Sequence, residues 1–591
     1  MRSFVDDLRS KLRGEGAYLT VLCAVGAMRL INLGFLDLQA WDEALYAVRA
    51  RGILLFGGIF DQTSFAIGGL YSSLHPPLYV WLTSISFLIF GVSEFAARFF
   101  SAFLGAGTIL LIYRIGRDLD SPKVGFVAAM LFGLNPFVSF FARQGQFDSA
   151  LVFFLTLAAY YYLRTHESRA LQYAFYAGAA VGAALMTKLF VGCGIVLAYF
   201  VWKAYASEDE NKRKWTSLLV SLAAAAAVAL PWHVYMTIIH GHGRPLFFLE
   251  ASAVLERSIS GVEGNVKPLE VFYYINQLLV LFPLGIAWFV MDLRKAFGER
   301  KSGWLFLALW FLIFFVVFSL MRTKLSVYIL PMLVPASLIA ARSMVNYSKG
   351  QYSDKLAAVL LGATSILILW SASQDWRNLV KSIPTALLSG RFPSGSSVIQ
   401  ILPLFVVAAC VLYLLRVLYR RGALNVVRGL TIPILLLLSF LLTFYSIVGR
   451  DQFLYDDGGC ALAQFIAQRG PSTILVAGFD RNPQLTYYLD GADIGWRDDI
   501  EMTRVVPPTA RSEFRSWLSQ ESSVLPADAL VIVEKDKFIR YEWVTAEEIN
   551  PVDYALVFNS RRYAVFQRVQ IDQLALSSSQ HHESIRGSGK E

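Results

Sequence analysis

The sequence has 591 residues, of which 56% are hydrophobic and only 16% are charged. Soluble proteins carry about 25% charged residues, so this composition excludes an ordinary soluble enzyme and indicates a surface that largely faces lipid. The net charge of +9 does not indicate nucleic-acid binding, because the Lys and Arg residues lie between apolar runs, as the orientation of a membrane protein requires. The four cysteines are scattered and form no disulfide framework.

Long apolar runs recur from residue 16 to residue 448. A helix needs about 20 apolar residues to cross a bilayer, and the chain offers about thirteen such runs. They cover residues 16–34, 96–116, 124–141, 147–163, 172–187, 189–205, 216–237, 271–293, 304–320, 325–342, 356–373, 399–416 and 430–448. We therefore predict an α-helical polytopic membrane protein, and we expect the first run to be retained as a span rather than cleaved as a signal peptide.

One further apolar run, 76–90, is short and opens with two prolines. If this run does not cross and the N-terminus is cytoplasmic, the inner loops carry about twice as many Lys and Arg residues as the outer loops, which is the usual bias. If it crosses, every later loop changes side and the bias inverts. We therefore predict an interfacial helix at 76–90 on the outer face, with the C-terminus also outside.

The chain after residue 445 has a different pattern, with short β-prone segments and no long apolar run. Strands are predicted at 472–478 and 529–534, a hairpin at 554–559 and 563–568, and a helix at 511–518. This pattern divides the chain into three parts. They are a transmembrane domain at 1–449, a small extracytoplasmic α/β domain at 450–572, and a disordered tail at 573–591.

Two adjacent acids, Asp42 and Glu43, follow the first predicted span almost at once. An acid at this place can be a general base or a cation ligand. The alternative is a solvated loop in which Asp42 is a helix N-cap, and without further context that alternative is favoured.

His75 precedes the two prolines that open the predicted interfacial helix. A single histidine is usually a hydrogen-bonded interface residue, but near Asp42 it could bind phosphate or a metal.

Arg143 and Asp148 lie five residues apart in a short outer loop between two predicted spans. They can pair with each other. Alternatively, Arg143 faces a phosphate and Asp148 faces a sugar or a cation.

Two further outer turns carry cations: one holds Arg322 and Lys324, and the other holds Lys188. The alternatives for such residues are anchoring at the membrane surface and binding of a polyprenyl phosphate headgroup.

Taken together, these segments resemble the GT-C membrane glycosyltransferases, in particular the lipid A aminoarabinose transferases and the protein O-mannosyltransferases. The matching segments, in chain order, are Asp42-Glu43 with Tyr46, His75-Pro76-Pro77-Leu78, Glu94-Phe95-Ala96-Ala97-Arg98, Ala142-Arg143 with Asp148, Thr187-Lys188, Pro231-Trp232, and Thr323-Lys324 with Tyr328 and Pro331. The resemblance spans about residues 20–340 and is more specific for the superfamily than for the substrate. The position of His75 is filled by His in mannosyltransferases and often by Lys in aminoarabinose transferases, so the subfamily stays open.

The resemblance implies a sugar donor linked to a polyprenyl phosphate, such as undecaprenyl or dolichyl phosphate. It also implies inverting transfer outside the cytoplasm to an envelope glycolipid such as lipopolysaccharide, a polysaccharide or a protein. Asp42 would then be the catalytic base, and Glu43 and Asp148 would orient the acceptor or the sugar. The implied substrate-binding residues are Tyr46, His75, Arg143, Lys188, Arg322, Lys324 and Tyr328. We expect Asp42, Arg143, Asp148 and Lys324 to share one cavity at the outer edge of a membrane, most simply the inner membrane of a bacterium.

Two other functions remain open at this point. A lipid or solute transporter or flippase would explain many spans with buried charges, but such proteins often have repeated halves, and no repeat is visible here. A non-catalytic scaffold is the second. There is no GxGxxG or Walker-type loop and no zinc-type spacing, so we expect neither nucleotide nor zinc, and we leave a divalent cation open as a cofactor.

Overall fold

The structure is a computed structural model of the chain. It describes residues 2–39, 42–67, 69–70, 75–188, 190–206, 211–240, 251–252, 255–256, 259, 272–299, 302–352, 363, 424–445, 458–477, 483–488, 501–505, 526, 528–534, 554–560 and 562–568. The predicted span at 356–373, apart from residue 363, lies outside these residues, as do the predicted span at 399–416, the predicted helix at 511–518 and the predicted tail.

The chain divides into two compact units. The first contains Met1–Leu33, Leu74–Leu82 and Arg98–Arg450, and the second contains Gly34–Ser73, Thr83–Ala97 and Asp451–Glu591. Most of the segment that follows the first predicted span therefore belongs to the same unit as the C-terminal part of the chain. The domain boundary at residue 450 stays a prediction.

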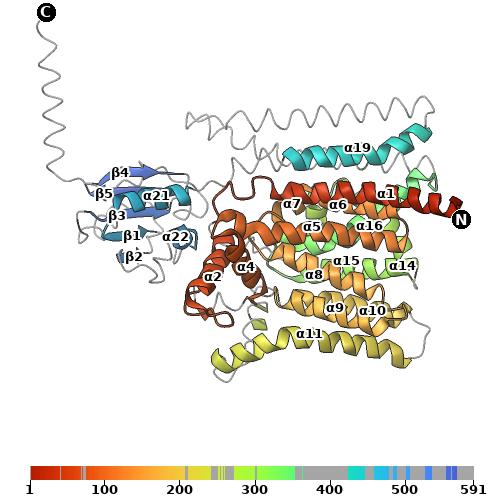
Figure 1. Ribbon diagram of the computed structural model, residues 1–591, viewed down its shortest axis with the longest axis horizontal. Helices are drawn as coiled ribbons and strands as arrows, with labels where there is room; N and C mark the ends of the chain where they lie inside the picture. The colour runs from red at the N-terminus through yellow and green to blue at the C-terminus, as the bar shows by residue number, and fades with distance from the viewer. Residues whose placement is uncertain are drawn as a thin grey trace, which may run out of the picture. The chain divides into compact units, whose positions relative to one another are not determined.

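Most helices of the first unit are apolar and run side by side with roughly parallel axes (Figure 1). The unit contains α1 (Arg2–Ala27), η1 (Met28–Leu30), α5 (Glu94–Leu119) from Arg98 onward, α6 (Pro122–Gly133), α7 (Pro136–Phe141), α8 (Asp148–Tyr162), α9 (Ala170–Leu185), α10 (Val191–Ala206), α11 (Asn211–His240), α13 (Tyr273–Leu281), α14 (Ile286–Gly298), α15 (Gly303–Leu320), η2 (Ser326–Ile329), α16 (Leu330–Ser348) and α19 (Leu424–Tyr445). Helix α16 is buried from Leu330 to Tyr347, because it carries apolar and small residues on every face.

Helices α9 and α11 approach each other closely because small residues lie between them. A Cβ atom added to Gly178 would stand 2.1 Å from the backbone oxygen of Ser221. Small residues at such contacts let the backbones of membrane helices meet, so this pair packs as spanning helices do.

Among the described residues, four helical segments are long and apolar enough to cross a membrane: Glu94–Leu119, Trp215–His240, Gly303–Leu320 and Ser326–Ser348. A bent pair, α13 and α14, adds a fifth if it counts as one span. These lengths confirm a helical membrane protein in outline, whereas the count of about thirteen spans stays a prediction.

Two predicted spans are broken in the structure, and proline stands at each break. The run at 271–293 divides at Pro283 into α13 and α14, which are bent by 119°. The run at 124–141 divides at Asn135, whose Oδ1 accepts a hydrogen bond from the Val138 N–H at 3.1 Å while Pro136 begins α7. Proline lacks a backbone N–H and ends a preceding helix, an effect that the count of apolar residues does not register.

The second unit contains α2 (Asp42–Phe56), the C-terminal part of α4 (Leu78–Phe90), the short helices α21 (Gly459–Arg469) and α22 (Pro483–Tyr488), and a sheet. Helix α4 confirms that the run at 76–90 is helical, and its place at the membrane interface stays a prediction.

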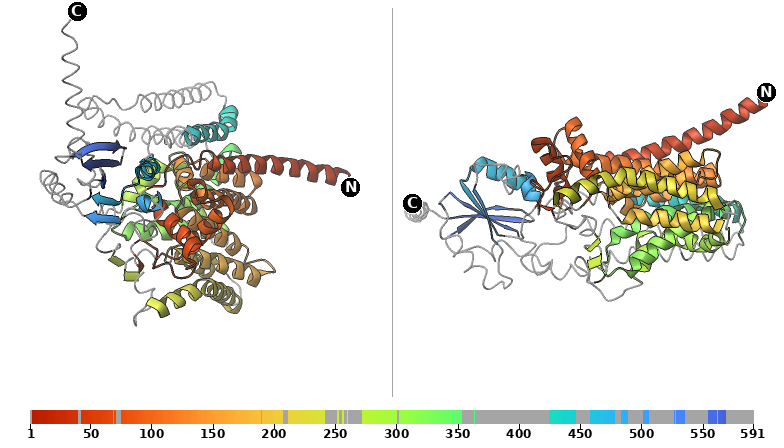
Figure 2. Two further views of the ribbon diagram at one scale, coloured as in Figure 1. Left: turned by 60° about the vertical axis from the view of Figure 1, so that its left-hand side comes forward. Right: turned by 90° about the horizontal axis from the view of Figure 1, so that it is seen from below.

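The sheet has five strands in the order β2-β1-β3-β5-β4, as labelled in Figure 1. Figure 2 shows the strands, in blue, from two further sides. They are β1 (Thr473–Ala477), β2 (Glu501–Val505), β3 (Leu530–Glu534), β4 (Tyr554–Asn559) and β5 (Tyr563–Arg568). Strands β2, β1 and β3 are parallel, and the β4–β5 hairpin adds antiparallel to β3. The predicted strands are confirmed, and β2 was missed because its residues, EMTRV, form no apolar run.

The buried face of the sheet packs against the two short helices of the second unit. Ile474, Ile532 and Val565 from the strands form one core with Leu462 of α21 and Leu485 of α22. This core fixes α22 on the sheet, and α22 carries Gln484 and Tyr488, whose side chains bind the backbone of Leu38.

Candidate functional site

The predicted site residues are divided between the two units. Asp42, Glu43 and Tyr46 lie in the second unit. The other seven lie in the first unit: His75, Arg143, Asp148, Lys188, Arg322, Lys324 and Tyr328. The expectation that Asp42 shares one cavity with Arg143, Asp148 and Lys324 therefore stays a prediction.

The two adjacent acids lie in the first turn of α2 and have different surroundings. The unpaired N–H groups at a helix start favour carboxylates there. Asp42 is exposed, whereas Glu43 is fully buried and its Oε2 accepts a hydrogen bond from the Gln39 N–H at 2.8 Å. Glu43 therefore holds the backbone that leads into α2, whereas Asp42 is exposed. Tyr46, one turn further on, is buried.

Within the first unit, four predicted residues come together from distant parts of the sequence. The His75 ring lies 5.9 Å from the Phe147 ring, which directly precedes Asp148. The Lys188 ammonium lies 4.9 Å from the centroid of the same Phe147 ring and 4.8 Å from that of Tyr328. We refer to His75, Asp148, Lys188 and Tyr328 as the first-unit cluster.

Charge and backbone contacts both hold this cluster together. Asp148, the buried first residue of α8, interacts electrostatically with the Lys188 ammonium. The Leu78 N–H donates to the Met186 carbonyl at 3.2 Å, which joins the segment after His75 to the turn that carries Lys188. The cluster thus combines an acid, a cation and aromatic faces, a set of groups that suits a sugar phosphate.

Arg143 binds backbone at the end of the first predicted span. Its Nη1 donates to the carbonyl of Arg29 at 3.0 Å and to that of Ile31 at 2.6 Å. The Arg98 Nη1 donates to the Leu33 carbonyl at 3.0 Å. All of these side chains are buried, so arginines satisfy three carbonyls where the first span ends.

Arg29 was not singled out from the sequence, although it is almost completely buried, with 1% of its surface exposed. Its guanidinium donates to the Val25 and Gly133 carbonyls at 3.4 Å each. Gly133 is the last residue of α6, so Arg29 places a positive charge where the carbonyls of that helix end. An ionisable residue inside an apolar run was the available signal.

Lys324 is also bound to the end of a helix. Its Nζ donates to the carbonyls of Phe318 and Ser319 at 3.1 and 2.6 Å, near the end of α15, and only 2% of Lys324 is exposed. The Lys324 side chain therefore turns inward, against the end of α15. Arg322, two residues earlier, is exposed. The phosphate-binding role proposed for both residues stays a prediction.

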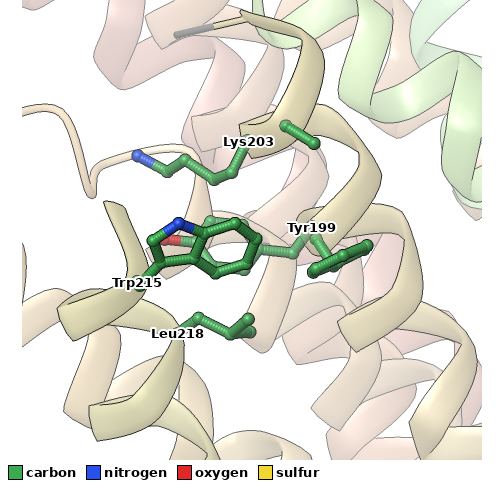
Figure 3. Close-up of a pocket in the computed structure, with 6 residues that line it drawn as sticks. Tyr199, Lys203, Trp215 and Leu218 are labelled. Carbon is green, nitrogen blue, oxygen red and sulfur yellow. The ribbon is translucent and has the colours of Figure 1, made fainter. Parts of the chain in front are cut away.

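A separate pocket lies between α10 and α11, lined by Tyr199, Phe200, Lys203, Ala204, Trp215 and Leu218 (Figure 3). None of the predicted site residues lines it.

One group of possible metal ligands occurs among the residues that the structure describes. An oxygen of Asp37, an oxygen of Glu94 and the sulfur of Cys460 lie within 4.8 Å of one another in the second unit. Hydrogen bonds account for this arrangement: Asp37 accepts from the Cys460 N–H at 3.2 Å, and Glu94 accepts from the Tyr488 hydroxyl at 3.0 Å. No metal role is assigned to this group.

Comparison with known proteins adds a family match and two kinds of relatives. Residues 74–235 match the family described as dolichyl-phosphate-mannose-protein mannosyltransferase. An uncharacterized protein of Aquifex aeolicus is 25% identical over 67% of this chain and 77% of its own length. The undecaprenyl phosphate-alpha-4-amino-4-deoxy-L-arabinose arabinosyl transferase of Pseudomonas aeruginosa is 27% identical over 55% of this chain, and the match spans 59% of that enzyme.

A solved structure extends the likeness over nearly the whole chain. The crystal structure of ArnT from Cupriavidus metallidurans bound to undecaprenyl phosphate is similar with a TM-score of 0.65, over 94% of this chain and 98% of that one, at 20% identity. The chain shares the fold of that protein. The predicted resemblance to GT-C membrane glycosyltransferases of the aminoarabinose and O-mannosyl types is confirmed.

Proposed function

We propose that this chain is a membrane glycosyltransferase that moves a sugar from a polyprenyl-phosphate carrier to a hydroxyl or phosphate of an envelope glycolipid, polysaccharide or protein. The observation that carries the proposal is the first-unit cluster, in which an acid, a cation and aromatic rings converge from residues 75 to 328. The resemblance to enzymes named for this chemistry supports it.

The proposed reaction needs a base and a stabilised leaving group. The acceptor oxygen attacks the anomeric carbon from the face opposite the phosphate, the bond from that carbon to the phosphate oxygen breaks, and the configuration inverts. Asp42 takes the proton of an acceptor hydroxyl, and polyprenyl phosphate departs. A positioned carboxylate contributes about 10²–10⁴-fold by base catalysis, and fixed cations stabilise the phosphate charge that develops.

The remaining residues receive supporting roles. Lys188 is the best candidate for binding the departing phosphate, because its ammonium lies against two aromatic rings rather than at a helix end. Arg143, Arg322 and Lys324 are further phosphate candidates, and Asp148 with His75 and Tyr328 would bind the sugar. In the second unit, Glu43 orients the start of α2 beside Asp42. Tyr46, one turn further along α2, is a candidate for binding the substrate.

The proposal includes a location. The proposed location is a bacterial inner membrane, with the N-terminus inside and the acids, the cations and the C-terminal α/β part outside the cytoplasm, and the Lys and Arg bias supports this orientation. The proposed partners are the lipid-linked donor, a lipid or protein acceptor and membrane lipids, and nucleic acid is not among them. A divalent cation remains open as a cofactor.

Transfer by the full chain in lipid nanodiscs tests this function. Undecaprenyl-phosphate aminoarabinose and polyprenyl-phosphate mannose are supplied as donors, with lipid A and a Ser/Thr peptide as acceptors. We expect the wild-type chain to transfer sugar from one of these donors, and we expect Asp42→Asn to lower kcat about 10²–10⁴-fold, because it removes the base. Binding of undecaprenyl phosphate should be unchanged.

A matched control is Asp120→Asn, which makes the same chemical change at an exposed residue in the turn after α5. Wild-type turnover in Asp42→Asn would refute the catalytic assignment. Absence of transfer from every donor by the wild-type chain would refute the proposed function.

A further inference from the structure

We infer that the C-terminal α/β part of the chain positions the segment that leads into α2, and that Gln484 and Tyr488 of α22 are positioning residues for Asp42, the first residue of α2. The inference rests on the proposed function, because it needs Asp42 to be the base. It gives the C-terminal part a role in turnover.

Both polar backbone groups of Leu38, four residues before Asp42, are bound by side chains of α22. The Leu38 N–H donates to the Tyr488 hydroxyl at 2.9 Å, and its carbonyl accepts from Gln484 Nε2 at 2.6 Å. Leu38 is fully buried, so water cannot replace either partner. The N–H and the carbonyl of Leu38 are therefore both held by a helix that lies about 450 residues later in the sequence.

The sheet in turn fixes the side chain of Gln484. The Tyr563 hydroxyl, on β5, donates to Gln484 Oε1 at 2.6 Å, and both side chains are fully buried. Since Oε1 accepts from Tyr563 and Nε2 donates to Leu38, the amide has one orientation that satisfies both partners. The contact runs without interruption from β5 through Gln484 to the backbone of Leu38.

Tyr488 makes a second connection through the same oxygen atom. Its hydroxyl accepts from Leu38 and donates to Glu94 Oε1 at 3.0 Å. Burial, together with the nearby Asp37 and Glu94 carboxylates, raises the pKa of Tyr488, so its hydroxyl keeps its proton and can donate.

Two further contacts hold the chain on either side of Asp42. Before it, Asp37 Oδ2 accepts from the N–H of Cys460 at the start of α21, at 3.2 Å. After it, the Arg51 Nη1 of α2 donates to the Tyr487 carbonyl at 3.2 Å. Asp42 therefore lies between two points of the chain that are both bound to the C-terminal part.

The consequence for catalysis follows from distance. A general base must lie within hydrogen-bond reach of the proton that it removes, and a misplacement of about 1 Å can cost about 10²-fold in rate. Loss of the Leu38 contacts should lower kcat about 10- to 100-fold, while binding of the donor should change little, because the residues proposed to bind its phosphate lie in the first unit.

The test compares Gln484→Leu and Tyr488→Phe with the wild-type chain in nanodiscs. Gln464→Leu is the matched control, since Gln464 is exposed on α21 and its Nε2 makes a weak hydrogen bond to Cys460 Sγ at 3.7 Å. The readouts are kcat and KM for the donor per folded molecule, the Kd for undecaprenyl phosphate, and hydrogen–deuterium exchange of the peptide that contains residues 37–39. Tyr488→Phe removes a single oxygen, so it tests the inference even if Gln484→Leu reduces the amount of folded protein.

We expect both variants to lower kcat about 10- to 100-fold with KM and Kd within about twofold of the wild type, and to exchange faster at residues 37–39. A role in folding alone would lower the amount of folded protein and leave kcat per folded molecule unchanged, which would overturn the inference. Unchanged exchange at residues 37–39 would overturn it as well. If the wild-type chain transfers sugar and both variants keep its kcat, this inference fails while the proposed function stands.

Discussion

The connection between the first predicted span and Asp42 is held in two different ways along its length. In the first unit, the carbonyls of residues 29, 31 and 33 accept hydrogen bonds from the charged side chains of Arg143 and Arg98. In the second unit, Leu38 is held by the neutral side chains of Gln484 and Tyr488. The first set belongs to the helical unit, and the second set belongs to the unit with the sheet.

This difference has an energetic meaning. Hydrogen bonds to charged groups stabilise a fold by about 1.5–3 kcal/mol each, whereas neutral ones contribute about 0.5–1.5 kcal/mol. Where a helix ends beside lipid, water cannot bind its last carbonyls, and a charged donor is the strongest replacement. We therefore expect the charged contacts of the first unit to determine stability and the neutral contacts of the second unit to determine the geometry of the loop.

The largest effect is expected at Arg342 in α16, which tests whether buried charged contacts determine the stability of the first unit. Arg342 is buried and pairs with Glu299 at 2.5 Å and with the buried Asp292 at 3.5 Å. Arg342→Met leaves Asp292 without that cation, so we expect a loss of about 3–5 kcal/mol in the free energy of unfolding, measured by reversible unfolding in mixed micelles. Arg114→Met, at an exposed position of α5, is the control. Equal stability of the two variants would show that buried charge does not hold the first unit together.

A smaller loss is expected for Arg143→Met, because the hydrogen bonds from Arg143 to the Arg29 and Ile31 carbonyls involve neutral acceptors rather than a buried carboxylate. Two charge-assisted hydrogen bonds disappear, and we expect a loss of about 3 kcal/mol in the same unfolding measurement. If Arg143 instead serves only to bind phosphate, the stability of Arg143→Met will equal that of the wild type and the affinity for undecaprenyl phosphate will fall.

The smallest effect on stability is expected at Tyr563, whose hydroxyl makes one of the neutral hydrogen bonds of the second unit. Tyr563→Phe removes the buried hydrogen bond from the Tyr563 hydroxyl to Gln484 Oε1, which should cost about 1 kcal/mol in stability. Turnover should fall severalfold, less than in Gln484→Leu, because the amide of Gln484 can still donate to Leu38. A larger loss of turnover in Tyr563→Phe than in Gln484→Leu would contradict the order of contacts from β5 to Leu38.

Much of the fold could be predicted from the sequence because its signals are local. Apolar runs predicted helices, and short β-prone segments predicted β1, β3 and the β4–β5 hairpin. The breaks at Asn135 and Pro283 were not predicted, since a count of apolar residues over a window does not register where the backbone loses a hydrogen bond.

The candidate site divides in the same way. The members of the first-unit cluster could be predicted as candidate residues, because Asp148 and Lys188 are charged residues in short turns between apolar runs, but the grouping of His75, Asp148, Lys188 and Tyr328 was not predicted. Arg29 lies inside an apolar run rather than in a turn, so the criterion of charged residues between the runs did not include it. The hydrogen bond from Gln484 to the Leu38 carbonyl could not be predicted. The two residues are far apart in the sequence, and a side-chain bond to a backbone carbonyl leaves no local sequence pattern.

Mass spectrometry of envelope glycolipids and glycoproteins tests the central claim most directly, in cells that lack this chain and are complemented with the wild-type gene or with Asp42→Asn. The account predicts that one sugar modification disappears on deletion, returns with the wild-type chain and does not return with Asp42→Asn, although both proteins are present in the membrane in equal amount. Full restoration by Asp42→Asn, or an envelope with no sugar changed by the deletion, would contradict it.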